Sequence, residues 1–135
     1  MKLNLIQSQF IDFAWADGAS CLAEACSTSG GEITGDQLKL ILARGERQLV
    51  QLHDGEKICG WGVFRIDQLP NVRVLMITGL VAHNGRFEQF FEEIKQVARA
   101  YGCSSVRCAA GEAQERLYRM KCGFRPVHTI MEVKL

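Results

Sequence analysis

Three kinds of side chain in this sequence could carry chemistry, namely thiols, clustered cations, and carboxylates paired with imidazoles. The cysteines form no C-x-x-C pair, and most of them lie in apolar periodic segments; they are Cys21, Cys26, Cys59, Cys103, Cys108 and Cys122. A reduced thiol in such a segment behaves as a small hydrophobic group. The pattern therefore favours reduced core cysteines over a metal site.

The carboxylates and histidines do not form a catalytic constellation by spacing alone. Glu92–Glu93 and the pair Glu112 and Glu115 fit the solvent-facing sides of helices, and His128 lies in a strand-like segment. Acidic side chains on helices are mostly solvated. No paired-carboxylate or nucleophile–base arrangement is therefore predicted.

Polar residues precede a helical segment at Asn84, Gly85 and Arg86. The amino terminus of a helix attracts anions, so these residues could bind a phosphate. The alternative is that Asn84 caps the helix and Arg86 is solvated. A second basic cluster either binds a phosphate or an acidic protein or simply faces solvent; its members are Arg116, Arg119, Lys121 and Arg125.

Composition limits the class of protein. The chain has 135 residues, 47% of them hydrophobic, and a formal net charge of +1, which fits one compact domain spanning residues 1–135. A near-zero net charge argues against a nucleic-acid partner and favours a small molecule or a protein. We expect no membrane span and no secretory signal, and so a cytoplasmic protein, because long apolar runs are absent from the sequence.

The first third of the chain predicts one strand and two helices. Leu3–Gln7 fits a short strand, and Phe10–Cys26 fits a helix that a glycine interrupts. A loop at 27–31 follows. Thr34 and Gln37 are spaced as in a capping box, and Gly45 is a suitable stop, so a short second helix is expected between them.

The middle of the chain predicts strands. Gln48–His53 and Glu56–Ile66 flank Asp54-Gly55, a dipeptide typical of tight hairpin turns. Val72–Val81 is apolar on both faces, as expected of a central strand covered by helices on both sides. The hydrophobic period then changes from strand to helix.

The last third predicts a long helix over Arg86–Tyr101, whose apolar face comprises Phe87, Phe90, Phe91, Ile94, Val97, Ala98 and Tyr101. Ser104–Ala109 is predicted as a buried strand, Glu112–Lys121 as a helix ending at Gly123, and Val127–Val133 as a final strand with alternating faces. The predicted order is β-α-α-β-β-β-α-β-α-β.

Two segments of the carboxyl-terminal half resemble the acetyltransferase-like (GNAT) superfamily. Tyr101–Val106 looks like its helix-Gly-strand junction, and Leu117–Val127 resembles its "LYEKxGFxxV" ending. The resemblance implies an α/β (α+β) GNAT-like fold, with a mixed, largely antiparallel sheet of about six strands flanked by helices on both faces.

The chain also resembles a narrower group of short phage-encoded GNAT-like proteins. The resemblance lies in Glu32–Thr34, in Arg44–Leu49 and in Gly102-Cys103 after the long helix. Members of that group generally have no assigned function. This resemblance implies a phage or prophage source rather than an activity.

The GNAT resemblance implies transfer of an acetyl group from acetyl-CoA to a small-molecule or protein amine. The cofactor would lie along Leu80 and Val81 and the phosphate loop at Asn84, Gly85 and Arg86. In the family that loop carries two small residues, whereas this segment has a single glycine and is shorter. The loop is therefore degenerate, and weak CoA binding is expected.

By position, Tyr118 corresponds to a family tyrosine that protonates the departing CoA thiolate, and Asp67, His83 and, more remotely, His53 are candidates for the base. Packing alone is the alternative role for Tyr118. If the cofactor loop has lost its function, the chain is instead a non-catalytic interaction or assembly module with a phage or host protein partner.

Overall fold

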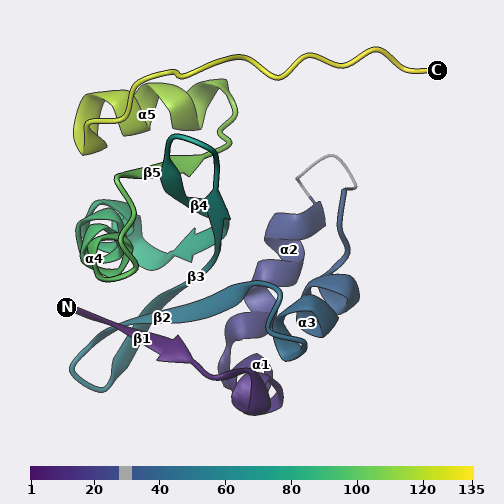
Figure 1. Ribbon diagram of the computed structural model, residues 1–135. Helices are drawn as coiled ribbons and strands as arrows, with labels where there is room; N and C mark the ends of the chain where they lie inside the picture. Colours follow the sequence, from purple (N-terminus) through teal and green to yellow (C-terminus); the bar gives the residue numbers. More distant parts are fainter. Residues whose placement is uncertain (28–31) are drawn as a thin grey trace.

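Helices cover both faces of a single sheet in the computed structural model, which describes residues 1–27 and 32–135 (Figure 1). The short helices α1–α3 pack on one face and the long helix α4 packs on the other, while α5 lies beside the last strand. The predicted loop at 27–31 falls mostly outside the described residues. The predicted layer order is confirmed.

The strands of the described residues form one five-stranded sheet in the order β1-β2-β3-β4-β5. Their bounds are β1 Lys2–Ile6, β2 Gln48–Asp54, β3 Lys57–Gln68, β4 Arg73–Ala82 and β5 Ser105–Cys108. The first four strands are antiparallel to their neighbours, and β5 runs parallel to β4. A parallel neighbour requires a crossover connection, which here is α4.

The first helical segment is divided at the glycine that was predicted to interrupt it. It contains α1 (Ile11–Asp17) and α2 (Leu22–Ser27), with short 3-10 turns before each. The break falls at Gly18, whose φ of 136° is strained for a residue with a side chain. The interruption predicted within Phe10–Cys26 is therefore confirmed, and it divides the segment into two short helices because the chain turns at this glycine.

The helix α3 (Gly35–Ala43) begins and ends as predicted. The Gln37 backbone N–H donates to the Thr34 Oγ1 at 3.2 Å, and the Thr34 backbone N–H donates to the Gln37 Oε1 at 2.9 Å. This reciprocal capping box satisfies two otherwise unpaired donors. Gly45 follows the helix in the left-handed region, with φ of 75°.

Each face of the sheet has its own hydrophobic core. On the α1–α3 side, Trp61 and Val63 from β3 meet Leu22 and Leu42 from the helices. On the α4 side, Phe64 from β3 packs with residues of α4 that include Phe90 and Ile94. The predicted helical face of α4 (Phe87–Ala100) is confirmed, since four of its residues are buried; they are Phe90, Phe91, Ile94 and Ala98.

The carboxyl-terminal elements depart from the predictions in two places. Strand β5 is an edge strand, and none of its residues is fully buried, because no further strand of the described chain covers it. After α5 (Glu112–Cys122) the left-handed Gly123 ends the helix as predicted. The predicted strand Val127–Val133 is wrong, because that segment leaves the body as an extended tail that pairs with no strand of residues 1–27 and 32–135 (Figure 1).

Candidate functional site

Strand β4 is paired with β5 along only part of its length, and its second half has no partner on that side in the described chain. The two strands are paired from Val74 and Ser105 to Ile77 and Cys108, where β5 ends. On the other side of β4, Val63 pairs with Gly79 and Phe64 with Ile77, so Thr78 is an extra residue in a bulge. The segment 78–82 of β4, which includes the predicted cofactor residues Leu80 and Val81, therefore has no partner on the β5 side in the described chain.

This unpaired half of β4 leads into the amino terminus of α4. His83, Asn84 and Gly85 form a single 3-10 turn, in which Asn84 has a φ of 55° and Gly85 a φ of 69°. The helix starts at Phe87, and its first residues have backbone N–H groups without partners inside the helix. Such donors, together with the helix dipole, favour an anion at this position.

Asn84 and Arg86 take neither of the simple roles considered for them. Asn84 makes no capping hydrogen bond, and the residue at the helix cap is Arg86. Arg86 is half-buried rather than solvated, and its Nη1 lies 3.5 Å from Asp54 Oδ2 in the β2–β3 turn and 3.6 Å from the Met1 Sδ. The guanidinium thus already has an anionic neighbour.

Tyr118 lies where α5 meets the start of α4. Its ring centroid is 5.0 Å from that of Phe91 and 5.9 Å from that of Phe87, and Phe124 packs against Phe91 at 4.8 Å. Leu80 and Cys108 belong to the same apolar cluster. The phenol is therefore held near Cys108, the residue at which β5 ends and its pairing with β4 stops.

The surroundings of Tyr118 keep both it and its neighbour protonated. Burial raises the pKa of the Tyr118 phenol, and the thiols of Cys108 and Cys122 add to that shift. Burial, with a smaller effect of Cys122, raises the pKa of the Cys108 thiol to about 11. A phenol that stays protonated at neutral pH can donate a proton but cannot serve as a base there.

The raised pKa of Cys108 predicts that stability falls at alkaline pH. The unfolded thiol loses its proton near its ordinary pKa, whereas the folded thiol keeps it up to about pH 11. The contribution is therefore fully present below the ordinary thiol pKa and is lost as pH rises toward 11. Urea unfolding at several pH values should show a smaller decline for Cys108→Ala than for the unchanged protein. Equal declines would contradict the assignment.

The structure does not bring Asp67 to Tyr118. Asp67 pairs with Val74, level with the start of β5, whereas Cys108 and Tyr118 are at its far end. Neighbouring residues of a strand point to opposite faces of the sheet. Since Ile66 packs in the core on the α4 side, the side chain of Asp67 points to the face covered by α1–α3. Its carboxylate accepts a 2.9 Å bond from the Arg65 Nε.

The two histidine candidates lie elsewhere. His83 is exposed in the turn before α4, within the segment that joins β4 to the helix. His53 lies in β2 with its Nδ1 3.0 Å from the Gly55 carbonyl, and its buried Nε2 has no hydrogen-bond partner in the part of the chain that is described. Among the three candidates, His83 is the one that directly follows the unpaired half of β4.

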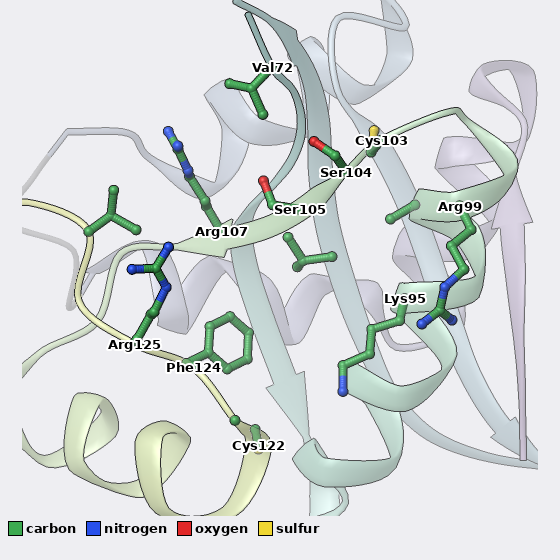
Figure 2. Close-up of a pocket in the computed structure, with 14 residues that line it drawn as sticks. Val72, Lys95, Arg99, Cys103, Ser104, Ser105, Arg107, Cys122, Phe124 and Arg125 are labelled. Atoms are coloured by element: carbon green, nitrogen blue, oxygen red, sulfur yellow. The ribbon is translucent and has the colours of Figure 1, made fainter.

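A groove adjoins the Tyr118 cluster on the β5 side, since Cys122 and Phe124 belong to both. It has a volume of about 530 Å³ and runs along β5 between α4 and the segment after α5 (Figure 2). Its lining includes Lys95 and Arg99 from one side and Arg107 and Arg125 from the other, but none of the predicted catalytic or cofactor residues. The groove therefore needs an explanation of its own.

Two neighbours of the site were missed by sequence reasoning. Cys108 was considered only as a core thiol, although its place at the end of a predicted strand is a usable signal. Asp54 was assigned to the hairpin turn, and no local pattern links it to Arg86, since the contact depends on how the turn packs against α4.

The sequence matches no family model and no curated protein. Solved structures are similar in fold. Ribosomal-protein-alanine N-acetyltransferase from Brucella melitensis biovar Abortus 2308 aligns with a TM-score of 0.72 and 12% identity, covering 100% of both chains. Glucosamine-6-phosphate N-acetyltransferase from Arabidopsis thaliana aligns at 0.65 and 16% identity, covering 99% of each chain.

A predicted acetyltransferase from Clostridium acetobutylicum, solved with acetyl-CoA, aligns at a TM-score of 0.67 and 12% identity, covering 98% of this chain and 95% of that one.

The sheet of the described residues has five strands, where about six were expected. Nothing in the comparisons tests the phage source, which stays a prediction. No helix of the described residues is long and apolar enough to cross a bilayer. The order of strands, the crossover helix and these alignments together establish that the chain has the GNAT acetyltransferase fold.

Proposed function

We propose that the chain is a GNAT-type acyltransferase that moves the acetyl group of acetyl-CoA to an amine. The observation that carries the proposal is the placement of Tyr118, a half-buried phenol with a raised pKa, where β5 ends and β4 continues alone. The unpaired backbone of residues 78–82 can hydrogen-bond an extended ligand arm. The neighbouring helix terminus suits phosphates.

In this proposal the acceptor amine attacks the thioester carbonyl, and the C–N bond forms as the C–S bond breaks. The CoA thiolate that leaves takes the proton of Tyr118, and the proton lost by the amine passes to solvent or to His83. Leu80 and Val81 line the cofactor arm, and Asn84, Gly85 and Arg86 form the phosphate end. The atoms and charges balance, because the phenol regains its proton from water.

One observation favours a second candidate, a non-catalytic interaction module. Arg86 is paired with Asp54, and the loop before α4 is a single 3-10 turn with one glycine. Its guanidinium must leave that carboxylate, or share it, to reach a phosphate. This competition is a physical reason to expect weak cofactor binding.

Calorimetric titration with acetyl-CoA tests the proposal. We expect a saturable but weak interaction that weakens further in Arg86→Ala. The matched variant is Asp54→Asn, which removes the competing carboxylate while leaving Arg86 in place, and it should strengthen binding. Ligand at a hundred times its dissociation constant should also stabilise the fold by about 2.7 kcal/mol. No heat at millimolar acetyl-CoA would reject the enzyme and leave the interaction module.

A further inference from the structure

Strand β5 presents a free edge. It is hydrogen-bonded to β4 on one side, and in the described part of the chain no strand lies on the other. All four of its residues, Ser105–Cys108, are only partly buried. A row of unpaired backbone N–H and C=O groups at a sheet edge is a template for another strand.

The groove along this edge has an unsatisfied polar group. The Ser105 Oγ is buried and has no hydrogen-bond partner among the described residues. Leaving a buried hydroxyl unpaired is costly, so the β5 edge of a single copy is incompletely satisfied. Figure 2 shows Ser105 on β5 with Phe124 and Arg125 on one side of it and the α4 side chains on the other.

The same molecule carries a strand-forming segment without a sheet. The tail after Gly123 has one side composed of Val127, Thr129, Met131 and Val133, while the residues between them are mostly polar. This period-two pattern is typical of a half-buried strand. Yet Met131 is 88% exposed and Val133 is 82% exposed. The apolar side of the tail is thus left in water.

The tail does not fill the groove of its own chain. Val127 lines the groove, but the residues beyond it run past α5 and away from the body (Figure 1). One copy therefore has both an open edge and an unused strand. Two copies related by a twofold axis can satisfy both needs at once, because each tail can reach the other copy's edge.

We propose that two copies of this chain form a dimer by exchanging their tails, with residues 127–134 of each copy added as a strand to β5 of the other. The exchange covers the apolar side of the tail and supplies backbone partners to the free edge. Charge does not oppose it, since Glu132 and Lys134 leave the tail close to neutral where it meets a groove lined by cations; the cations are Lys95, Arg99, Arg107 and Arg125.

Light scattering after gel filtration tests the dimer. The unchanged protein should have twice the 15.1 kDa mass of one chain. Met131→Asp places a charge on the apolar side of the tail and should yield a monomer. The control His128→Asp introduces the same residue on the polar side and should remain dimeric. Because both positions are exposed, both variants should keep the helical circular dichroism of the unchanged protein.

A monomeric unchanged protein, or a dimer that survives Met131→Asp, would overturn the proposal. Crosslinking distinguishes exchange from a tail that folds onto its own edge. A photoreactive benzoylphenylalanine replaces Val133 in a mixture of normal and heavy-nitrogen chains. Exchange predicts crosslinks to the β5 peptide that join one normal and one heavy chain. The exchange would be refuted if crosslinks joined only peptides of the same isotope, or if no crosslink reached the β5 peptide.

Discussion

Replacing Phe90 with alanine should lower the free energy of unfolding by about 3–5 kcal/mol, the usual cost of truncating a buried phenylalanine. Phe90 is 1% exposed on the inner face of α4, and its ring meets Phe91 edge-on at 5.7 Å. The neighbouring backbone cannot collapse easily into the space, because the ring lies over a strand. Urea unfolding followed by circular dichroism measures the change, and a near-neutral result would contradict the two-layer core.

The ring of Phe90 packs against Gly62, and this contact allows a second test of the same core. A Cβ added at Gly62 would lie 2.5 Å from the Phe90 Cζ, so Gly62→Ala should cost about 1–3 kcal/mol through overpacking. In the Phe90→Ala background that clash is absent. The double variant should therefore be more stable than the sum of the two single losses predicts.

Gly79 provides the matched control. It lies on β4, and an added Cβ there would have ordinary contacts of 3.7–3.8 Å with Val63 and Leu22. Gly79→Ala should change stability little. The comparison also tests whether Gly62 lacks a side chain because the Phe90 ring packs over it. Equal, additive effects at both glycines would reject the packing explanation.

The elements that sequence predicted well are those in which a local pattern and the final packing agree. The Asp54-Gly55 turn joins β2 and β3 as expected, with Gly55 at a φ of 62°. The face of α4 could be predicted because its apolar residues recur at helical spacing. Such features depend on neighbours along the chain, and tertiary contacts only reinforce them.

The features that sequence did not predict depend on whether a pairing strand is present or on contacts between segments that are far apart in the chain. The segment Val127–Val133 has a strand pattern, but a strand forms only where it pairs with a sheet edge, and in its own chain this segment does not pair with the free edge of β5. The same alternation therefore appears as an exposed tail. The pairing of Arg86 with Asp54 joins a loop to a hairpin turn, and neither segment carries a local signal for it. In the candidate site, sequence predicted Tyr118 by resemblance but not the thiols that surround it.

If the chain is an enzyme, Tyr118→Phe should reduce the turnover rate by roughly 10²–10⁴-fold, the usual contribution of a positioned general acid. The change removes a hydroxyl and almost no volume, so the ring contacts with Phe87 and Phe91 should persist. Acetyl-CoA affinity, measured by calorimetry, should stay nearly unchanged. A parallel loss in affinity and turnover would show that Tyr118 binds rather than donates a proton.

The second tyrosine of the chain is the control. Tyr101 is 39% exposed after the end of α4, where its ring packs against Phe64 and its carbonyl accepts a hydrogen bond from the Arg73 Nε at the start of β4. Tyr101→Phe should therefore leave turnover unchanged. The pH dependence of turnover is a second measurement, and a side chain with only a packing role would not change it. Because burial raises the pKa of Tyr118, the alkaline loss of turnover should lie above the ordinary phenol pKa, and Tyr118→Phe should abolish that limb. Full activity in Tyr118→Phe would assign this side chain to packing only.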